Sequence, residues 1–248
     1  MAEVGLQLYT VRDETARDFA GTVRKVAALG YLAVEFAGYG DLSAEDMRDL
    51  LAETGMRAAS SHVGLAALEA DFDRELAYCV TIGCPNLFLP WLPLEQRGSD
   101  FFAALAPRLN EYGRRARAAG VTFGYHNHDF EFALDDGQTL LARLLDATDP
   151  NLVTLELDVY WAAYAGFDPI ALLRRYAGRV PVIHLKDMDT DRRYTEVGDG
   201  TLDITAISAT ATEGGTAWLI VEHDAPTLPS LDSAKRSLEN LRRLGIAG

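Results

Sequence analysis

The chain has 248 residues, of which 48% are hydrophobic and 24% are charged, and its formal net charge at pH 7 is −14. This acidic balance argues against nucleic acid or an anionic membrane as a partner, because both bind to basic surfaces. No apolar run reaches the roughly 18 residues that a membrane span needs, and the N-terminus lacks the basic, apolar and small-residue order of a signal peptide, so we expect a cytoplasmic protein.

The chain alternates short apolar runs with helical patterns from end to end. The predicted strands are residues 4–9, 32–36, 57–62, 86–89, 121–126, 152–158, 180–186 and 217–222. The predicted helices are residues 18–29, 44–54, 65–82, 100–119, 139–147, 168–176, 204–213 and 231–244. Strict alternation implies a parallel sheet with right-handed crossovers. Eight units in about 250 residues predict a single (β/α)8 TIM barrel, with residues 1–248 as one domain.

The main rival to the barrel is an open, doubly wound sheet. Its nucleotide-binding form needs a glycine-rich loop directly after the first strand. Here the first predicted strand is followed by Thr10-Val11-Arg12-Asp13, which contains no glycine. The sequence therefore favours the closed barrel.

Polar side chains stand at the carboxyl ends of four predicted strands, and they are His126, Asp158, His184 and Glu222. In a barrel of parallel strands these ends meet on one face, so we expect the four side chains to form one site. His184 and Lys186 are two residues apart and therefore point to the same side of their strand. Imidazole and carboxylate ligands suit Mn²⁺, Co²⁺, Mg²⁺, Zn²⁺ or Fe²⁺, and a cation would relieve the repulsion between clustered carboxylates.

Seven motifs cover most of the chain in a fixed order. They are GLQLYTVRD (5–13), VEFAG (34–38), GYHNHDFEF (124–132), LDVYWAAYAGFDP (157–169), HLKD (184–187), VGDGTLD (197–203) and VEHD (221–224). With these motifs the chain resembles the xylose isomerase-like TIM-barrel superfamily, in its sugar phosphate isomerase/epimerase branch. The resemblance implies one divalent metal ion, usually held by Glu, Asp, His and Glu from the last four strands. Asp158, His184 and Glu222 match the last three of these ligands.

The fifth strand departs from the family pattern. His126 stands where a typical member has a glutamate, and Glu131 follows in the next loop. Either His126 is the fourth ligand or Glu131 reaches back to the metal, and the sequence leaves both readings open.

The resemblance implies an isomerase or epimerase that acts on a keto sugar or related polyol through a metal-stabilised enediolate. Glu222, Glu131 and His128 are candidates for the base that moves the proton, and Lys186 is a candidate partner for an oxyanion or a substrate hydroxyl. The alternative is a metal-dependent lyase that eliminates from a keto sugar, a keto-inositol or a 3-keto-glycoside, as the inosose dehydratases of this superfamily do with their own substrate. The missing strand-5 glutamate keeps this alternative open.

Residues at other strand ends are candidates for contact with the substrate. Gln7, Glu35 and His62 stand at the ends of the first three strands, and Trp91 and Trp161 follow the fourth and sixth strands. Aromatic rings can pack against the C–H faces of a sugar, so a small-molecule sugar is the expected partner. The resemblance also implies a possible homo-oligomer.

Two other classes of protein are disfavoured. A DNA-repair endonuclease shares this barrel, but it needs more metal ligands and a basic face, whereas this chain carries a charge of −14 and has Trp161 three residues after Asp158. A sugar-binding barrel without catalysis is disfavoured because Asp158, His184 and Glu222 are all present.

Overall fold

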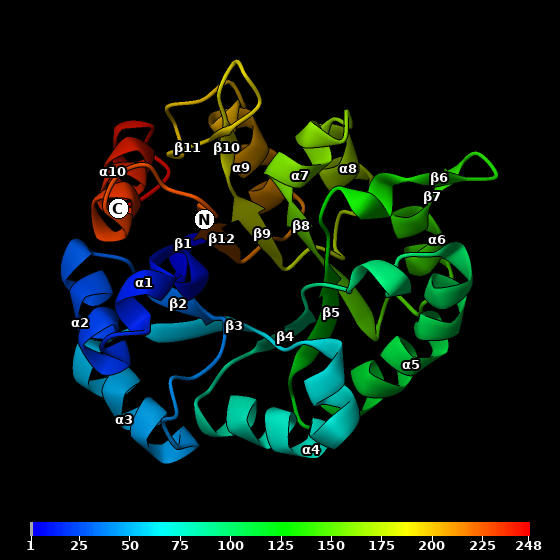
Figure 1. Cartoon of the computed structure of the whole chain (residues 1–248), viewed down its shortest axis with the longest axis horizontal. Helices are drawn as coiled ribbons and strands as arrows, with labels where there is room; N and C mark the ends of the chain where they lie inside the picture. Colours follow the sequence, from blue (N-terminus) through cyan, green and yellow to red (C-terminus); the bar gives the residue numbers. More distant parts are fainter. Residues whose placement is uncertain (1) are drawn as a thin grey trace.

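The computed structural model describes residues 2–248 and contains a closed barrel of eight parallel strands (Figure 1). In chain order the strands are β1 (Glu3–Gln7), β2 (Ala33–Phe36), β3 (Arg57–His62), β4 (Asn86–Leu89), β5 (Thr122–His126), β8 (Val153–Asp158), β9 (Val182–Leu185) and β12 (Trp218–Val221). The barrel closes where β1 pairs in parallel with β12, from Glu3 opposite Trp218 to Leu6 opposite Val221. The predicted fold class is therefore confirmed.

Helices surround the barrel and connect successive strands (Figure 1). The eight predicted helices correspond to α2 (Phe19–Leu29), α3 (Ala44–Thr54), α4 (Leu65–Thr81), α5 (Ser99–Ala118), α6 (Leu140–Asp146), α8 (Pro169–Arg175), α9 (Ile204–Glu213) and α10 (Ser230–Arg243). Side-chain caps fix their starts: Asp18 accepts from the Gly21 N–H, and Ser43 accepts from the Asp46 N–H. Gly30 ends α2 at a φ of 100°, which few other residues adopt.

Short elements in the connecting loops were not predicted. They are η1 (Leu8–Val11), α1 (Arg12–Thr15), η2 (Leu94–Gln96), η3 (Phe130–Phe132), α7 (Val159–Tyr164) and two hairpins, β6 (Leu134–Asp135) with β7 (Gln138–Thr139) and β10 (Asp187–Met188) with β11 (Tyr194–Thr195). In Figure 1 the β6–β7 hairpin projects from the rim of the molecule. These elements have two to six residues, too few for a repeating hydrophobic pattern to be recognised.

The barrel interior changes from apolar to polar along the strands. Ala33, Ala59, Val182 and Ile220 belong to one small buried cluster inside the barrel. Two residues further along β9 from Val182, on the same face of the strand, lies the fully buried His184. The larger apolar cluster lies between the barrel and the helices. The polar residues inside the barrel therefore pack against an apolar layer on one side and face the carboxyl ends of the strands on the other.

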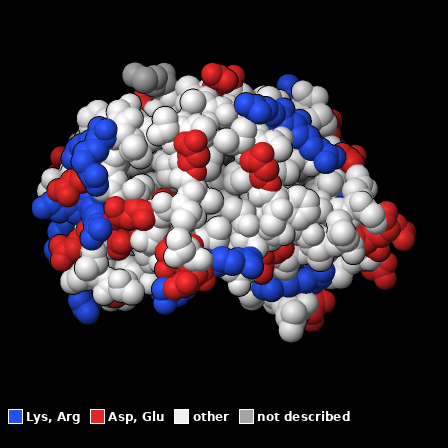
Figure 2. Space-filling view, turned by 90° about the horizontal axis from the view of Figure 1, so that it is seen from above, with Lys and Arg blue, Asp and Glu red and all other residues white. Residues whose placement is uncertain are grey.

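Charges of both signs are distributed over the outer surface. On the face in Figure 2, clusters of acidic and basic side chains lie mainly towards the edge, and isolated acidic side chains stand within the mostly uncharged central area. Within residues 2–248, no helix combines the length and the hydropathy that a membrane span requires.

Candidate active site

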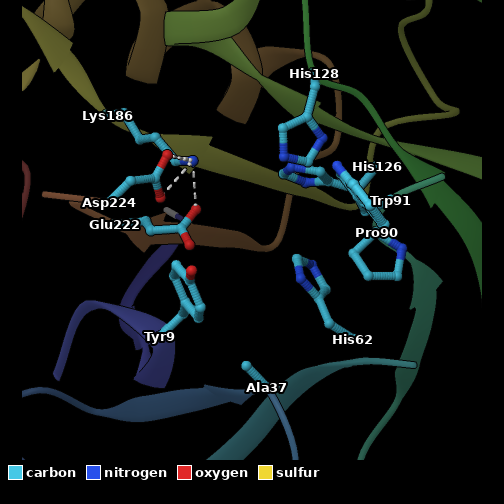
Figure 3. A pocket seen from close by; sticks show the side chains of 10 residues that line it. All are labelled: Tyr9, Ala37, His62, Pro90, Trp91, His126, His128, Lys186, Glu222 and Asp224. Carbon is cyan, nitrogen blue, oxygen red and sulfur yellow. Dashed lines mark hydrogen bonds and ion pairs between the residues drawn. The ribbon is translucent and has the colours of Figure 1, made fainter. Parts of the chain in front are cut away.

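A cavity of about 630 Å³ lies at the carboxyl ends of the strands, where sites in barrels of this kind are found. Its lining residues are Tyr9, Ala37, His62, Pro90, Trp91, His126, His128, Lys186, Glu222 and Asp224. Figure 3 shows Lys186, Glu222 and Asp224 on one side of the cavity and three histidines on the other. Six of these ten residues were predicted from the sequence, and they are His62, Trp91, His126, His128, Lys186 and Glu222.

Asp158, His184 and Glu222 form the group that the sequence analysis expected to hold a metal, with ligand atoms that all lie within 4.8 Å of one another. His184 Nδ1 is 2.7 Å from Glu222 Oε2 and 4.0 Å from Asp158 Oδ2. The Trp161 N–H at the start of α7 donates to Asp158 Oδ1 over 3.0 Å, which fixes the carboxylate. Asp158 Oδ2 is buried, and within residues 2–248 it faces the ammonium group of Lys186, with 3.1 Å between Oδ2 and Nζ. The set therefore offers a cation one nitrogen ligand and two carboxylates.

Lys186 is the cation that lies closest to this group. Its Nζ is 2.8 Å from Glu222 Oε2, 3.1 Å from Asp158 Oδ2 and 2.9 Å from Asp224 Oδ2, and its side chain is only 2% exposed. Burial lowers the pKa of Lys186, but the charges of the three carboxylates outweigh this effect and hold that pKa well above its ordinary value. Lys186 therefore remains a charged hydrogen-bond donor at neutral pH.

A second polar group lies deeper in the barrel, and it contains Glu35, His62, His126, Glu156 and His184. Glu156 Oε2 is 2.5 Å from His62 Nε2 and 3.0 Å from His126 Nδ1. Glu35 Oε1 is 2.6 Å from His184 Nε2. Burial lowers the pKa of His184, but Glu35, Glu156 and Glu222 outweigh it and raise that pKa well above its usual value. The two nitrogens of His184 thus face different acidic groups.

Glu131 is fully buried, but it belongs to neither of the two groups of side chains that could hold a metal ion. Its Oε1 accepts from the Tyr125 hydroxyl and its Oε2 accepts from the His128 N–H, both over 2.7 Å. Burial raises the pKa of Glu131 to about 8, although these two hydrogen bonds lower it. Of the two strand-5 alternatives, the structure brings His126 and not Glu131 next to Asp158, with 3.9 Å between His126 Nε2 and Asp158 Oδ2.

His128 and the two predicted tryptophans occupy different depths of the site. Burial lowers the pKa of His128 to about 3, so its imidazole is neutral at physiological pH. Trp161 packs against His128, with 5.5 Å between the ring centres, and Lys186 Nζ lies 5.7 Å from the centre of the Trp161 ring. Trp91 is 48% exposed at the rim, where Arg97 lies over its ring.

Gln7, Glu35 and Trp161 are absent from the lining of the cavity among the residues described. Gln7 and Glu35 are fully buried, and the Gln7 amide donates to Glu35 Oε1 over 2.5 Å. The Ser60 hydroxyl donates to the other oxygen of Glu35. The structure therefore places Gln7 and Glu35 behind the histidines and not at the cavity wall where contact with a substrate was expected.

Glu156 and Asp224 lie in the site but were not predicted. Glu156 precedes Asp158 by two residues on β8, and Asp224 follows Glu222 by two residues. Alternation along an extended chain places such pairs on the same side, so the spacing itself was the signal. Glu156 was overlooked because it stands within an apolar run and not at its end.

Comparisons with known proteins agree with this architecture. The family model described as xylose isomerase-like TIM barrel matches residues 23–244. An inosose dehydratase from Geobacillus kaustophilus is 28% identical over 89% of this chain and 85% of its own length. The crystal structure of a sugar phosphate isomerase/epimerase from Parabacteroides distasonis superposes with a TM-score of 0.85, at 24% identity, over all of this chain and 96% of that one.

A crystal structure of the IolI protein, which is described as binding a zinc atom, superposes with a TM-score of 0.79 at 15% identity, over 98% of this chain and 97% of that one. At these identities the two solved structures establish the fold alone. Because the family model matches most of the sequence, the chain belongs to the xylose isomerase-like TIM barrel family.

Proposed function

We propose that this protein is a divalent-metal-dependent isomerase or epimerase of a keto sugar or related polyol. The observation that carries the proposal is the convergence of Asp158, His184 and Glu222 at the cavity, where their ligand atoms all lie within 4.8 Å of one another. Two buried carboxylates this close together need positive charge beside them, and a divalent cation supplies more of it than the Lys186 ammonium alone.

The donor atoms fit a divalent cation such as Mn²⁺, Co²⁺, Mg²⁺ or Zn²⁺. Asp158, His184 and Glu222 would hold it, and His126 stands beside them. The zinc named for the IolI structure, whose barrel is similar, supports such a site. When bound, the ion polarises the substrate carbonyl and stabilises the negative charge that develops when the neighbouring carbon loses its proton.

Groups of this chain on different sides of the cavity can move that proton. Glu222 lies on the side of Lys186, and the neutral His128 lies opposite (Figure 3). One of them takes the proton from the carbon beside the carbonyl, and its return to the opposite face of that carbon gives the epimer. Return to the former carbonyl carbon gives the isomer. The Lys186 ammonium donates a hydrogen bond to a substrate oxygen during the transfer.

A dehydratase is the second candidate, and the position of Lys186 favours it. Its buried ammonium lies beside the proposed base, Glu222, and it can donate a hydrogen bond to a departing hydroxyl group, which takes up the proton that leaves the carbon. Loss of the carbon-bound proton and of the neighbouring hydroxyl then releases water and leaves a carbon–carbon double bond next to the carbonyl. The similarity to an inosose dehydratase supports this outcome.

The two candidates share a first step and differ in the product. We would incubate the protein, loaded with Mn²⁺ or Co²⁺, with unphosphorylated and phosphorylated keto sugars and with a keto-inositol in D₂O, and follow the products by NMR and by ultraviolet absorbance. Deuterium on the carbon beside the carbonyl, together with a new sugar, indicates isomerisation or epimerisation. An absorbing unsaturated ketone indicates dehydration.

Asp158→Asn is the matched variant, because it keeps the hydrogen bond to the Trp161 N–H and removes the charge that a cation needs. We expect it to lose both bound metal and turnover. Glu53→Gln, on the exposed helix α3, serves as the control and should retain both. A wild-type protein that takes up no divalent ion and exchanges no proton in any of these substrates would overturn the proposal.

A further inference from the structure

The deeper polar group contains more ligand atoms than the proposed function uses. His62 on β3, His126 on β5 and Glu156 on β8 offer two imidazole nitrogens and a carboxylate. Together with His184 their ligand atoms all lie within 4.8 Å of one another. These residues come from three separate strands, so the barrel itself holds them together.

The three ligand atoms lie close enough for one ion to contact all of them, although one pair is closer than the ligands of a bound ion would be. Glu156 Oε2 is 2.5 Å from His62 Nε2 and 3.0 Å from His126 Nδ1. Ligands about 2.1 Å from one ion lie roughly 3.0–3.5 Å apart, so a small outward movement of the His62 ring would admit a cation between the three atoms. The side chain of His62 is 11% exposed, at the edge of the cavity, and it can make this movement.

Glu156 provides an independent sign that a ligand belongs here. The residue is fully buried, and its Oε1 accepts no hydrogen bond within the described part of the chain. The charged partners within reach of Glu156 are histidines, and the neighbouring Glu35 adds a second buried carboxylate. A buried carboxylate needs a positive partner or a full set of donors, and a divalent ion supplies this.

His184 separates the deeper group from the outer one. Its Nε2 is directed to Glu35 Oε1 at 2.6 Å, whereas its Nδ1 is directed to Glu222 Oε2 at 2.7 Å. His184 therefore belongs to the outer group through Nδ1, while its Nε2 is hydrogen-bonded to Glu35. Without His184, the deeper group consists of His62, His126 and Glu156. None of these three belongs to the outer group.

We propose that His62, His126 and Glu156 form a second divalent-cation site next to the one at Asp158, His184 and Glu222. Two nitrogens and one carboxylate favour Zn²⁺, Co²⁺ or Fe²⁺ over Mg²⁺ or Ca²⁺. His62 and His126 line the cavity, so an ion held by them has free positions on the side of a substrate. With ions at both sites, the centre would favour a substrate that carries oxygen atoms on neighbouring carbons.

The test is the number of ions bound per chain. We would strip the full-length protein with a chelator, load it with Co²⁺, remove excess ion and measure the cobalt content by elemental mass spectrometry. The expected content is two ions per chain in the wild type and one in Glu156→Gln. Asp158→Asn should also retain one, and Glu53→Gln should retain two.

A spectroscopic measurement tests whether the two ions are neighbours. With Mn²⁺ at both sites, magnetic coupling should broaden the electron paramagnetic resonance signal. The narrow signal of an isolated ion should return in either single-site variant. If Glu156→Gln does not fold, as judged by circular dichroism, His62→Asn takes its place, because His62 lies at the edge of the cavity and is partly exposed.

The possible results separate this inference from the proposed function. One ion in the wild type that Asp158→Asn loses and Glu156→Gln retains would overturn the second site and leave the proposed function intact. One ion that Glu156→Gln loses and Asp158→Asn retains would support the deeper site and overturn the ligands named for the outer one. No bound ion in the wild type would overturn both.

Discussion

His184 illustrates how one hydrogen bond can set the chemistry of a neighbouring atom. Glu35 Oε1 lies 2.6 Å from His184 Nε2 and Glu222 Oε2 lies 2.7 Å from Nδ1, and the raised pKa of the ring keeps a proton on each nitrogen. A cation that binds at Nδ1 replaces the proton there, while Glu35 retains the one on Nε2. Carboxylates that orient a ligating histidine in this way typically contribute a factor of about 10–100 to metal affinity. Glu35 is thus a positioning residue in our proposal and not a substrate contact.

Replacing Glu35 by Gln should weaken metal binding while leaving the ligands in place. We expect the affinity for Mn²⁺ or Co²⁺ at the outer site to fall about tenfold, since the neutral amide holds the imidazole less firmly. Isothermal titration calorimetry on the stripped protein measures this, with Glu53→Gln as the control. An unchanged affinity would mean that Glu35 only packs against the ring.

Glu131 leads to a prediction about stability and pH. Burial raises its pKa to about 8 in the folded protein, from an ordinary value of 4.5. A carboxyl group with a raised pKa gives its full stabilisation below pH 4.5 and loses it progressively as the pH rises towards 8. The free energy of unfolding should therefore decrease between these two pH values, by as much as a few kcal/mol, and level off above pH 8.

Glu131→Gln should remove this part of the pH dependence, because the amide does not titrate. Urea unfolding of both proteins at pH 5, 7 and 9 measures it. The difference in unfolding free energy between wild type and variant should shift in favour of the variant as the pH rises. Parallel curves for the two proteins would show that Glu131 keeps the same charge throughout.

Residues at the ends of apolar runs could be recognised from the sequence, and those within the runs could not. Asp158, His184 and Glu222 each interrupt an apolar pattern near a predicted strand end, and the structure brings them together. Glu156 stands between Leu155 and Leu157, where a single polar residue looks like ordinary alternation. The orientation of the Glu131 side chain depends on its hydrogen bond with the Tyr125 hydroxyl. The local sequence pattern does not predict this hydrogen bond.

At the scale of elements, Asp187 holds the loop that follows β11. Its carboxylate accepts hydrogen bonds from the backbone N–H groups of Met188, Gly198, Gly200 and Leu202, over 2.8 to 3.2 Å. A side chain at position 200 would overlap this carboxylate, so the turn requires a glycine there. One buried side chain thus orders a stretch of loop at the mouth of the barrel.

Asp187→Ala should release that loop, because four backbone donors lose their acceptor at once. We expect a loss of about 2–4 kcal/mol in the free energy of unfolding and faster proteolysis between residues 196 and 202. Thermal unfolding and limited Glu-C digestion, which cleaves after Glu196, measure the two effects. Asp191→Ala, in the same connection but exposed and paired only with Arg193, should change neither. Equal behaviour of the two variants would contradict this role for Asp187.

Long elements were predictable because they repeat a pattern, and short ones were not. The periodic apolar face and the terminal glycine of α2 fix its position within one residue. By contrast, α7 has six residues and begins directly after Asp158, whose side chain accepts a hydrogen bond from the Trp161 N–H and whose position in the sequence indicates only a metal ligand. In our proposal one oxygen of this carboxylate caps the helix and the other binds the ion.

For the whole molecule, the acidic site predicts a link between metal binding and stability. The folded protein brings Asp158, Glu222 and Asp224 around a single lysine, and an ion that binds only the folded state adds to its stability. Saturation at 100 times the dissociation constant contributes about 2.7 kcal/mol. Chelation should therefore lower the melting temperature by several degrees, and added Mn²⁺ or Co²⁺ should restore it.

Asp158→Asn provides the comparison for this experiment. Differential scanning calorimetry should find that its melting temperature responds less to chelator than that of the wild type. An equal response in both proteins would place the stabilising ion elsewhere in the chain. Ionic strength is kept constant throughout, since a chain with a net charge of −14 also responds to salt.

The closure of the barrel between β1 and β12 has a consequence for how the protein is made. While the ribosome is still extending the chain, one edge of β1 has no strand to pair with. Its backbone N–H and C=O groups remain unpaired until β12 has been synthesised. Glu222 follows β12 directly, so Asp158 and His184 are synthesised well before the residue that completes their group. In our proposal, capture of an ion by these three residues is therefore among the last events in biosynthesis. A chain whose translation stops before β12 can neither close its sheet nor bind the ion through all three ligands.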